Sequence, residues 1–322
     1  MIRFLLRRFG HALLLLLGVS ILLFILMQAS PGDFLSEAQL SGRVSPESMH
    51  ALRVQYGMDQ SLPVRYVRWV QSAVSGDFGY SFAYNMPASR LLLPRARNTL
   101  LLTIPALLLS WLIAVPLGVV VASRRGNWLD RLYSSGTSTL LSAHDLLLAL
   151  LALFLALRTG AFPTGGMASL NGTSLTAWQG WKDLLWHSAL PVMVLVIASL
   201  APILRHVRSS MIEVLHSPYI HAAEGHGIGR LKLLFGHALP AAANPLVSLF
   251  GISTALLIGG SLLVEVVMSW PGMGPMVLEA ILSRDMFVVM GAVMFSTVFL
   301  IAGSLLADLL LYAVDPRIRM GA

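Results

Sequence analysis

The sequence predicts an all-α integral membrane protein with six transmembrane helices and with both termini in the cytoplasm. Of its 322 residues, 56% are hydrophobic and only 11% are charged, whereas soluble domains carry about 25% charged residues. The apolar residues also gather in runs long enough to cross a bilayer, which takes about 20 residues. Most of this chain is therefore expected to lie in lipid, and the bilayer is expected to be one of its partners.

Each of the six predicted spans is one of these apolar runs. They cover residues 9–30, 99–122, 132–157, 187–207, 245–268 and 286–314. The first follows Arg3, Arg7 and Arg8 and so resembles a secretory signal peptide, but its apolar core is too long and no small-residue cleavage site ends it. We expect it to be a retained first span.

The orientation follows from the cationic residues, because arginine and lysine accumulate in cytoplasmic loops. With the N-terminus inside, the predicted cytoplasmic segments hold twelve lysines and arginines and the two short external loops hold three. The segment 31–97 carries seven arginines, but loops longer than about 60 residues are largely exempt from the rule. The net charge of +7 is therefore explained by topology, and no nucleic-acid partner is expected.

We expect three parts along the chain: an N-terminal span at 1–30, an external helical cap at 31–97, and a membrane core at 98–322. In the cap, Ser45-Pro46-Glu47 is a helix start signal. Pro63 opens a second helix with an apolar stripe that includes Val64, Val67, Val70 and Val74. Packing on the span ends with interfacial contact is favoured over a direct role in substrate binding.

Catalytic and cofactor chemistry is not predicted. The chain has no cysteine, and neither of its lysines, Lys182 and Lys232, belongs to a phosphate-binding loop. His216, His221 and His226 recur every five residues, a spacing that turns successive helical side chains by about 140°. We therefore expect no metal site, no cofactor and no enzymatic activity.

Ionisable residues inside the predicted spans are candidates for the transport path. His144 and Asp145 fall near the middle of the third span, Glu265 lies near the outer end of the fifth, and Asp308 lies in the last. Such residues are costly in lipid and normally face a cavity or a partner. For His144 and Asp145 two readings stay open: contact with a cationic substrate, or a bond to a neighbouring span. Asp308 is expected to be structural, and Glu265 to act in a gate or in helix pairing.

Trp270, Pro271 and Gly272 are expected to form an interfacial tryptophan followed by a turn. The short semi-apolar segment 273–284 after them is interpreted as a re-entrant hairpin at the external mouth, with a plain surface loop as the alternative. The three residues are candidates for a gate.

A polar island at 219–240, YIHAAEGHGIGRLKLLFGHALP, separates two strongly apolar segments. Its Ala222-Ala223, Gly227 and Leu239-Pro240 have the spacing of the cytoplasmic loop of binding-protein-dependent ABC transporter permeases, although His221 and His237 stand where that loop has Glu and Ile. Further segments resemble the dipeptide, oligopeptide and nickel branch, in the permease with the long external loop. They are YGMDQSLPVRYVRW at 56–69, GDFGYS at 76–81, EVVMSWPGMG at 265–274, Asp308, and DPRIR at 315–319.

This resemblance implies the permease architecture of a type I ABC importer in the bacterial inner membrane. It also implies a second homologous permease, two ATPase subunits, an external binding protein, and peptides or nickel chelates as substrates. Within the loop 217–240, it assigns coupling to the ATPase to Tyr219, Ala222, Ala223, Gly227, Leu239 and Pro240. The alternative is an ion-coupled secondary transporter with a proton relay through His144, Asp145 and Asp308. A membrane-bound enzyme has no assembled nucleophile or metal set to support it.

Overall fold

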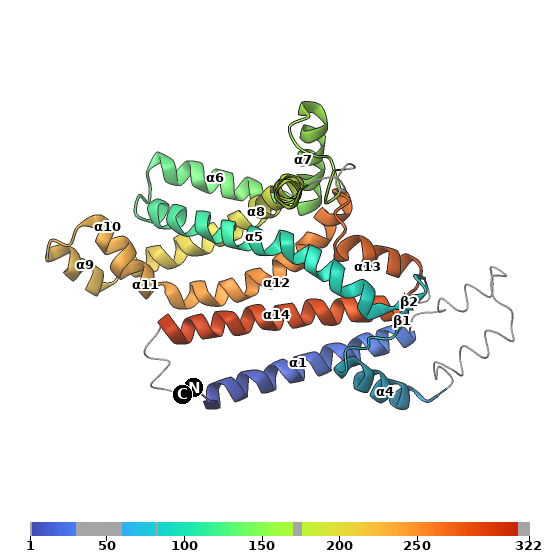
Figure 1. Ribbon diagram of the computed structural model, residues 1–322. Helices are drawn as coiled ribbons and strands as arrows, with labels where there is room; N and C mark the ends of the chain where they lie inside the picture. The colour runs from blue at the N-terminus through green and yellow to red at the C-terminus, as the bar shows by residue number, and fades with distance from the viewer. Residues whose placement is uncertain (1, 30–59, 82, 170–175, 315–322) are drawn as a thin grey trace. The chain divides into compact units, whose positions relative to one another are not determined.

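The computed structural model describes residues 2–29, 60–81, 83–169 and 176–314, and its secondary structure is almost entirely helical (Figure 1). The longer helices are α1 (Ile2–Ala29), α4 (Leu62–Val74), α5 (Ala88–Ala122), α6 (Trp128–Ser142), α7 (Asp145–Thr159), α8 (Ala177–Leu215), α12 (Ala243–Val267), α13 (Met273–Leu282) and α14 (Met286–Val314). The α8–α12 connection contains α9 (Pro218–Gly225), α10 (Arg230–Lys232), the π-helix η2 (Leu233–Ala238) and α11 (Leu239–Ala241).

Five of the described helices, α1, α5, α8, α12 and α14, are each long and apolar enough to cross a membrane, and the bent pair α6–α7 can supply a sixth span. The predicted all-α membrane fold is confirmed, and the cytoplasmic position of both termini stays a prediction. The third predicted span is wrong in one respect, because it is not a continuous helix: α6 and α7 meet at an angle of 98°. His144 is extended there, with φ −75° and ψ 142°, and caps α7. Polar side chains that bond locally compete with helical hydrogen bonds, which accounts for the break.

The chain forms two compact units, which are described separately. One comprises residues 1–6, 99–270 and 299–322, and the other comprises residues 7–98 and 271–298. The division predicted at residues 30 and 97 stays a prediction.

In the unit that contains residues 99–270, α8 packs against α6, α7 and α12. Glycines allow the helices to approach closely: a Cβ on Gly118 would lie 2.6 Å from a Val207 methyl, and one on Gly303 would lie 2.6 Å from the Thr254 methyl. Small residues have this role in membrane helices, where apolar burial gives little drive for association. Two polar links add to the packing. Ser110 on α5 shares a 2.7 Å hydrogen bond with Ser199 on α8, and the Trp111 indole donates to Ser253 on α12.

The other unit contains α4, the short hairpin of β1 (Tyr80–Ser81) and β2 (Met86–Pro87), and α13. Helix α4 begins at Leu62, with the predicted proline in its first turn, and packs on α1, where Tyr66 shares a 2.8 Å hydrogen bond with Ser20 and Trp69 is buried beside Phe24. The expected packing of this helix is confirmed. The hairpin was not predicted, and the helix start expected at Ser45 lies outside the described residues.

Asp285 joins the hairpin of this unit to the start of α14. Its carboxylate accepts hydrogen bonds from the Ser81 hydroxyl, at 2.5 Å, and from the Ala83 amide, at 3.2 Å. The neighbouring Tyr84 phenol donates to Glu279 on α13. Burial, followed by this hydrogen bond, raises the pKa of Tyr84 to about 12, so the phenol stays a donor at physiological pH. The carboxylates of Asp285 and Glu279 therefore fix Ser81, Ala83 and Tyr84 against α13 and the start of α14.

Candidate functional site

The connection between α8 and α12 is folded around one short helix, α9. Ser217 precedes it in an extended conformation and Pro218 occupies its first turn, where the missing amide hydrogen is not needed. After its last residue the chain reverses at Gly227, whose φ of +76° is favourable only for glycine. The expectation that Gly227 ends this helix is confirmed. Ile220 is 1% exposed and joins a cluster with Leu233 and Met211, so a single buried side chain fixes α9 to its base.

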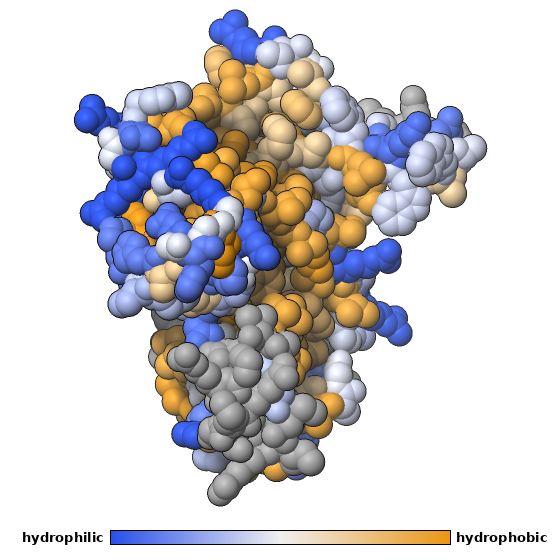
Figure 2. Space-filling view, turned by 90° about the vertical axis from the view of Figure 1, so that its left-hand side faces the viewer, coloured by the Kyte–Doolittle hydropathy of each residue, from blue (hydrophilic) through white to orange (hydrophobic). Residues whose placement is uncertain are grey.

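Of the predicted coupling residues, Tyr219, Ala222 and Gly227 are exposed in or just after this helix, whereas Ala223 packs against the cluster at its base. Tyr219 is 49% exposed, Ala222 and Gly227 are exposed, and Ala223 is half-buried. The side chains of His221 and Glu224 are also exposed, and 3.9 Å separates the His221 Nδ1 atom from the Glu224 Oε2 atom. Figure 2 looks onto the end of the molecule that carries α9, and hydrophilic side chains gather there next to apolar surface. A short rigid helix with small residues on its open side is suited to contact with another protein.

The other two predicted coupling residues lie elsewhere. Leu239 and Pro240 are on α11, where they line an apolar cavity of about 340 Å³ together with Trp111 and Phe250. The structure therefore does not bring them onto the surface formed by α9. Their position links the base of the loop to the spans α5 and α12.

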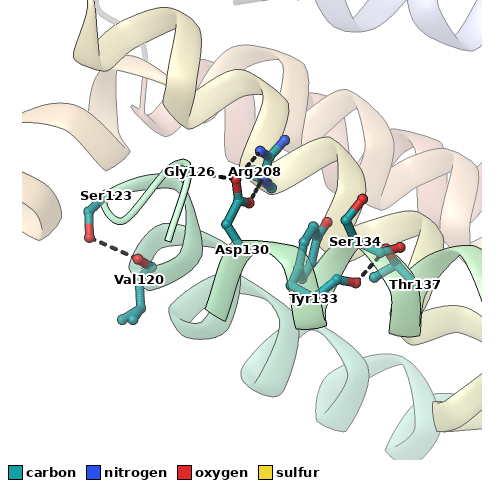
Figure 3. A network of polar contacts seen from close by, with 8 residues as sticks. All are labelled: Val120, Ser123, Gly126, Asp130, Tyr133, Ser134, Thr137 and Arg208. Carbon is teal, nitrogen blue, oxygen red and sulfur yellow. Dashed lines mark hydrogen bonds and ion pairs between the residues drawn. The ribbon is translucent and has the colours of Figure 1, made fainter. Parts of the chain in front are cut away.

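A polar network supports the same end of this unit, and sequence reasoning missed it (Figure 3). Arg208 on α8 donates two hydrogen bonds to Asp130 on α6, at 2.8 and 3.0 Å, and the Gly126 amide donates a third at 3.0 Å. Arg230, just after α9, donates to the Ser123 carbonyl at the end of α5 at 2.7 Å. One feature of the sequence pointed to this network. Asn127 is a residue type common at helix starts, and the acidic Asp130 stands in the first turn after it. These contacts connect α5, α6 and α8 at the base of the α9 segment.

His144 and Asp145 lie at the break between α6 and α7, and not within a continuous span as expected. The exposed His144 accepts the Leu146 amide hydrogen at 3.3 Å, so it caps α7. Asp145 is half-buried and faces α12: a Cβ on Gly260 would lie 2.7 Å from its Oδ2 atom. The two side chains therefore have different surroundings, and only Asp145 lines a cavity, of about 250 Å³, between α7, α8 and α12.

Glu265 and Trp270 lie near the C-terminal end of the 99–270 segment. Glu265 is fully buried near the end of α12, and its carbonyl oxygen accepts the Trp270 amide at 2.9 Å across a turn in which Ser269 has a φ of +51°. Trp270 is 0% exposed and belongs to the core. The expectation of an interfacial tryptophan is wrong, because the turn folds the indole back into the protein.

Pro271 and Gly272 belong to the other unit and precede α13. The Pro271 carbonyl accepts the Asn98 side-chain amide at 2.8 Å, and Gly272 is the residue that caps α13. Helix α13 buries Met273, Gly274, Met276 and Ala280. The segment is thus a packed helix and differs from the plain surface loop that was the alternative.

The described helices thus include five that are long and apolar enough to cross a membrane, one bent pair, and the short exposed helix α9 between α8 and α12. Comparison with known proteins agrees. Residues 114–320 match the family described as binding-protein-dependent transport system inner membrane component. Residues 1–103 match the family described as the N-terminal part of the membrane component of such systems.

Relatives that match over nearly the whole chain are named as permease proteins. The chain is 36% identical to a putative peptide permease protein of Brucella suis, covering 99% of this chain and 100% of the relative. It is 34% identical to the oligopeptide transport system permease protein AppB of Bacillus subtilis, with 99% and 100% covered. It is 30% identical to the dipeptide transport system permease protein DppB of Escherichia coli, with 99% of both chains covered.

The chain belongs to the family of binding-protein-dependent transport system inner membrane components. It is a permease subunit of an ABC importer and a multi-pass protein of the inner membrane. The family consists of transport subunits, which are not themselves catalytic.

Proposed function

We propose that this chain forms half of the translocation path of an ATP-driven peptide importer. A second homologous permease forms the other half, two ATPase subunits hydrolyse ATP, and an external binding protein delivers the solute. Membership of the family supports the general arrangement. The choice of peptides over nickel chelates rests on the names of the relatives, which are a putative peptide permease and oligopeptide and dipeptide permeases.

The observation that carries the proposal is α9, an exposed helix with one buried anchor. We assign to it the contact with the ATPase. The small exposed side chain of Ala222 lets a partner backbone approach closely, Ala223 packs at the base of α9, and Tyr219 offers a large exposed ring. When the ATPases close on ATP, a displacement of α9 is transmitted through Ile220 to the buried cluster at the base of α8. Leu239 and Pro240 act in the same path as a connection to α12.

The displacement of α9 must favour one of two packings of the spans. A bound partner shifts such an equilibrium only by the difference between its affinities for the two states. We assign the translocation path to the break that contains His144 and Asp145. The buried Glu265 and the turn at Trp270, Pro271 and Gly272 are assigned to the gate. Glu265 supports this assignment because a fully buried carboxyl group near a helix end is costly unless its packing is specific.

The test compares two glycine variants in vesicles that contain the complete assembly. Gly227→Val forces a β-branched residue into a left-handed conformation, which costs about 1–3 kcal/mol, and is expected to lower ATPase stimulation by the loaded binding protein. Gly225→Val is the matched control, because a Cβ there meets no atom within 4 Å and its φ is not positive. Equal coupled uptake by both variants would contradict the assignment of α9.

The ion-coupled carrier is the second candidate, and the same vesicles distinguish it. Uptake is expected to require the ATPase subunits and ATP, and to continue when the proton gradient is dissipated. Uptake driven by an ion gradient without the ATPases would instead establish the carrier.

A further inference from the structure

The cavity beside the α6–α7 break has one ionisable group in its wall. Its volume is about 250 Å³, and its lining is apolar apart from Asp145, Ser199 and Ser253. Pockets for whole drug-sized ligands measure about 300–1,000 Å³. This cavity is therefore of a size for one side chain or one terminus of a larger solute.

The two hydroxyl groups in the wall are already engaged. Ser199 donates to the Leu195 carbonyl at 2.7 Å and is bonded to Ser110. Ser253 donates to the Phe250 carbonyl at 2.8 Å and accepts from the Trp111 indole at 3.0 Å. The group left to determine which solutes the cavity accepts is the carboxylate of Asp145.

The carboxyl group of Asp145 lies at the start of a helix. Asp145 is the first residue of α7, where the positive end of the helix dipole stabilises an anion. Within the described ranges, no lysine, arginine or histidine forms an ion pair with this carboxylate. A negative charge on an otherwise apolar wall attracts a cation and repels an anion, and the low polarity of the wall strengthens both effects.

The chemistry of the wall also selects the kind of cation. A divalent metal ion needs several oxygen or nitrogen ligands, and this wall offers one carboxylate and two engaged hydroxyls. A protonated amine is satisfied by one carboxylate and an apolar surface for its carbon chain. An amine-bearing group is therefore the matching ligand.

We propose that Asp145 is the cation-selecting residue of the translocation path, and that its carboxylate receives a protonated side-chain amine of the passing peptide. The inference rests on the proposed function. Gly260 has a defined part in it, because any side chain there would collide with the carboxylate, at 2.7 Å, and move it out of the cavity. Its neighbour on α12, Gly259, supplies a matched control, because a Cβ on Gly259 would meet no atom within 4 Å.

The test measures ATP-dependent uptake by the complete assembly in vesicles, with the tripeptides Ala-Lys-Ala and Ala-Glu-Ala as probes. Each peptide is supplied at a concentration that saturates the binding protein, so that selection by that protein does not enter. The α-amino group is common to both probes and cancels in the ratio of their uptake rates. The ratio therefore reports the effect of a side-chain charge within the membrane.

Asp145→Asn is expected to lower the ratio of Ala-Lys-Ala to Ala-Glu-Ala uptake about tenfold, the change for a charge interaction of about 1.4 kcal/mol. Asp145→Glu is expected to keep most of the native ratio. Gly260→Ala is expected to lower it without removing a charge, and Gly259→Ala to leave it unchanged. Should Asp145→Asn fail to assemble, the two glycine variants give the same comparison.

An unchanged ratio in Asp145→Asn and Gly260→Ala, with uptake of both peptides retained, would overturn the selective role and leave the proposed function intact. Asp145 would then serve only as the N-terminal charge of α7. If the native assembly took up neither peptide with ATP, the proposed function and this inference would both be refuted.

Discussion

Replacing Ile220 with alanine is expected to detach α9 from its base and to uncouple ATP hydrolysis from transport. The side chain is 1% exposed, so its substitution removes three fully buried carbons. At about 0.8 kcal/mol for each carbon, the transfer term alone is about 2.4 kcal/mol. A residual cavity adds to this, within the range of about 2–5 kcal/mol for such substitutions.

This loss of packing free energy is large for a helix as short as α9. Helix α9 has 8 residues, and isolated helices shorter than about 12–15 residues are marginal in water. Its order therefore depends on packing through Ile220. A loss of about 2.4 kcal/mol raises the population of the detached helix about 60-fold.

Amide hydrogen exchange of residues 219–226 measures this population, and binding-protein-stimulated ATPase activity measures coupling. Ile220→Ala is expected to accelerate exchange about 60-fold and to reduce stimulation. Tyr219→Ala is the matched control, because this exposed neighbour can be truncated without opening the base; it should reduce stimulation without accelerating exchange. Unchanged exchange in Ile220→Ala would refute the argument that one side chain anchors α9.

Three further substitutions test the packing. Asp130→Asn weakens the paired hydrogen bonds to the Arg208 guanidinium and should cost about 1–3 kcal/mol, seen as a lower Tm of the assembly; an unchanged Tm would show that the pair adds nothing. Gly303→Ala forces a methyl against Thr254 and should lower Tm, whereas Gly259→Ala should not, and equal values for the two would contradict the close approach of α12 and α14. Asp285→Ala removes the acceptor of three donors, the Ser81 hydroxyl and the Ala83 and Val288 amides, and should lower Tm more than Ser81→Ala, which removes two hydrogen bonds; the reverse order would contradict the central role of the carboxylate.

Much of the candidate site could be predicted from local sequence. The spacing of Ala222, Ala223 and Gly227 predicted an exposed helix followed by a reversal, because glycine is the residue that a left-handed turn requires. Pro63 and the valines after it predicted α4 for an equally local reason. Leu239 and Pro240 matched the same motif but belong to a different surface, since only the fold around Trp111 decides where they lie.

Other features depended on contacts that a linear pattern does not carry. Averaged hydropathy treats residues 132–157 as one apolar span, and it does not register that His144 caps a new helix at 98° to the first. The burial of Trp270 depends on the turn at Ser269, because a tryptophan at a span end is equally compatible with the interface. The Asp130–Arg208 pair joins residues 78 positions apart and forms only when α6 packs on α8.

The sequence by itself determined the solvent, the spans and the family, because apolar length, charge placement and motif spacing are local properties. Only the tertiary structure decided which polar groups face a cavity and which are fixed in the core. His144 and Asp145 are adjacent in sequence, yet one caps a helix and the other lines a cavity. The physical reason is that the surroundings of a side chain in a membrane protein are set by neighbouring helices, and here the residues of α8 and α12 that line the cavity are 50 or more positions away along the chain.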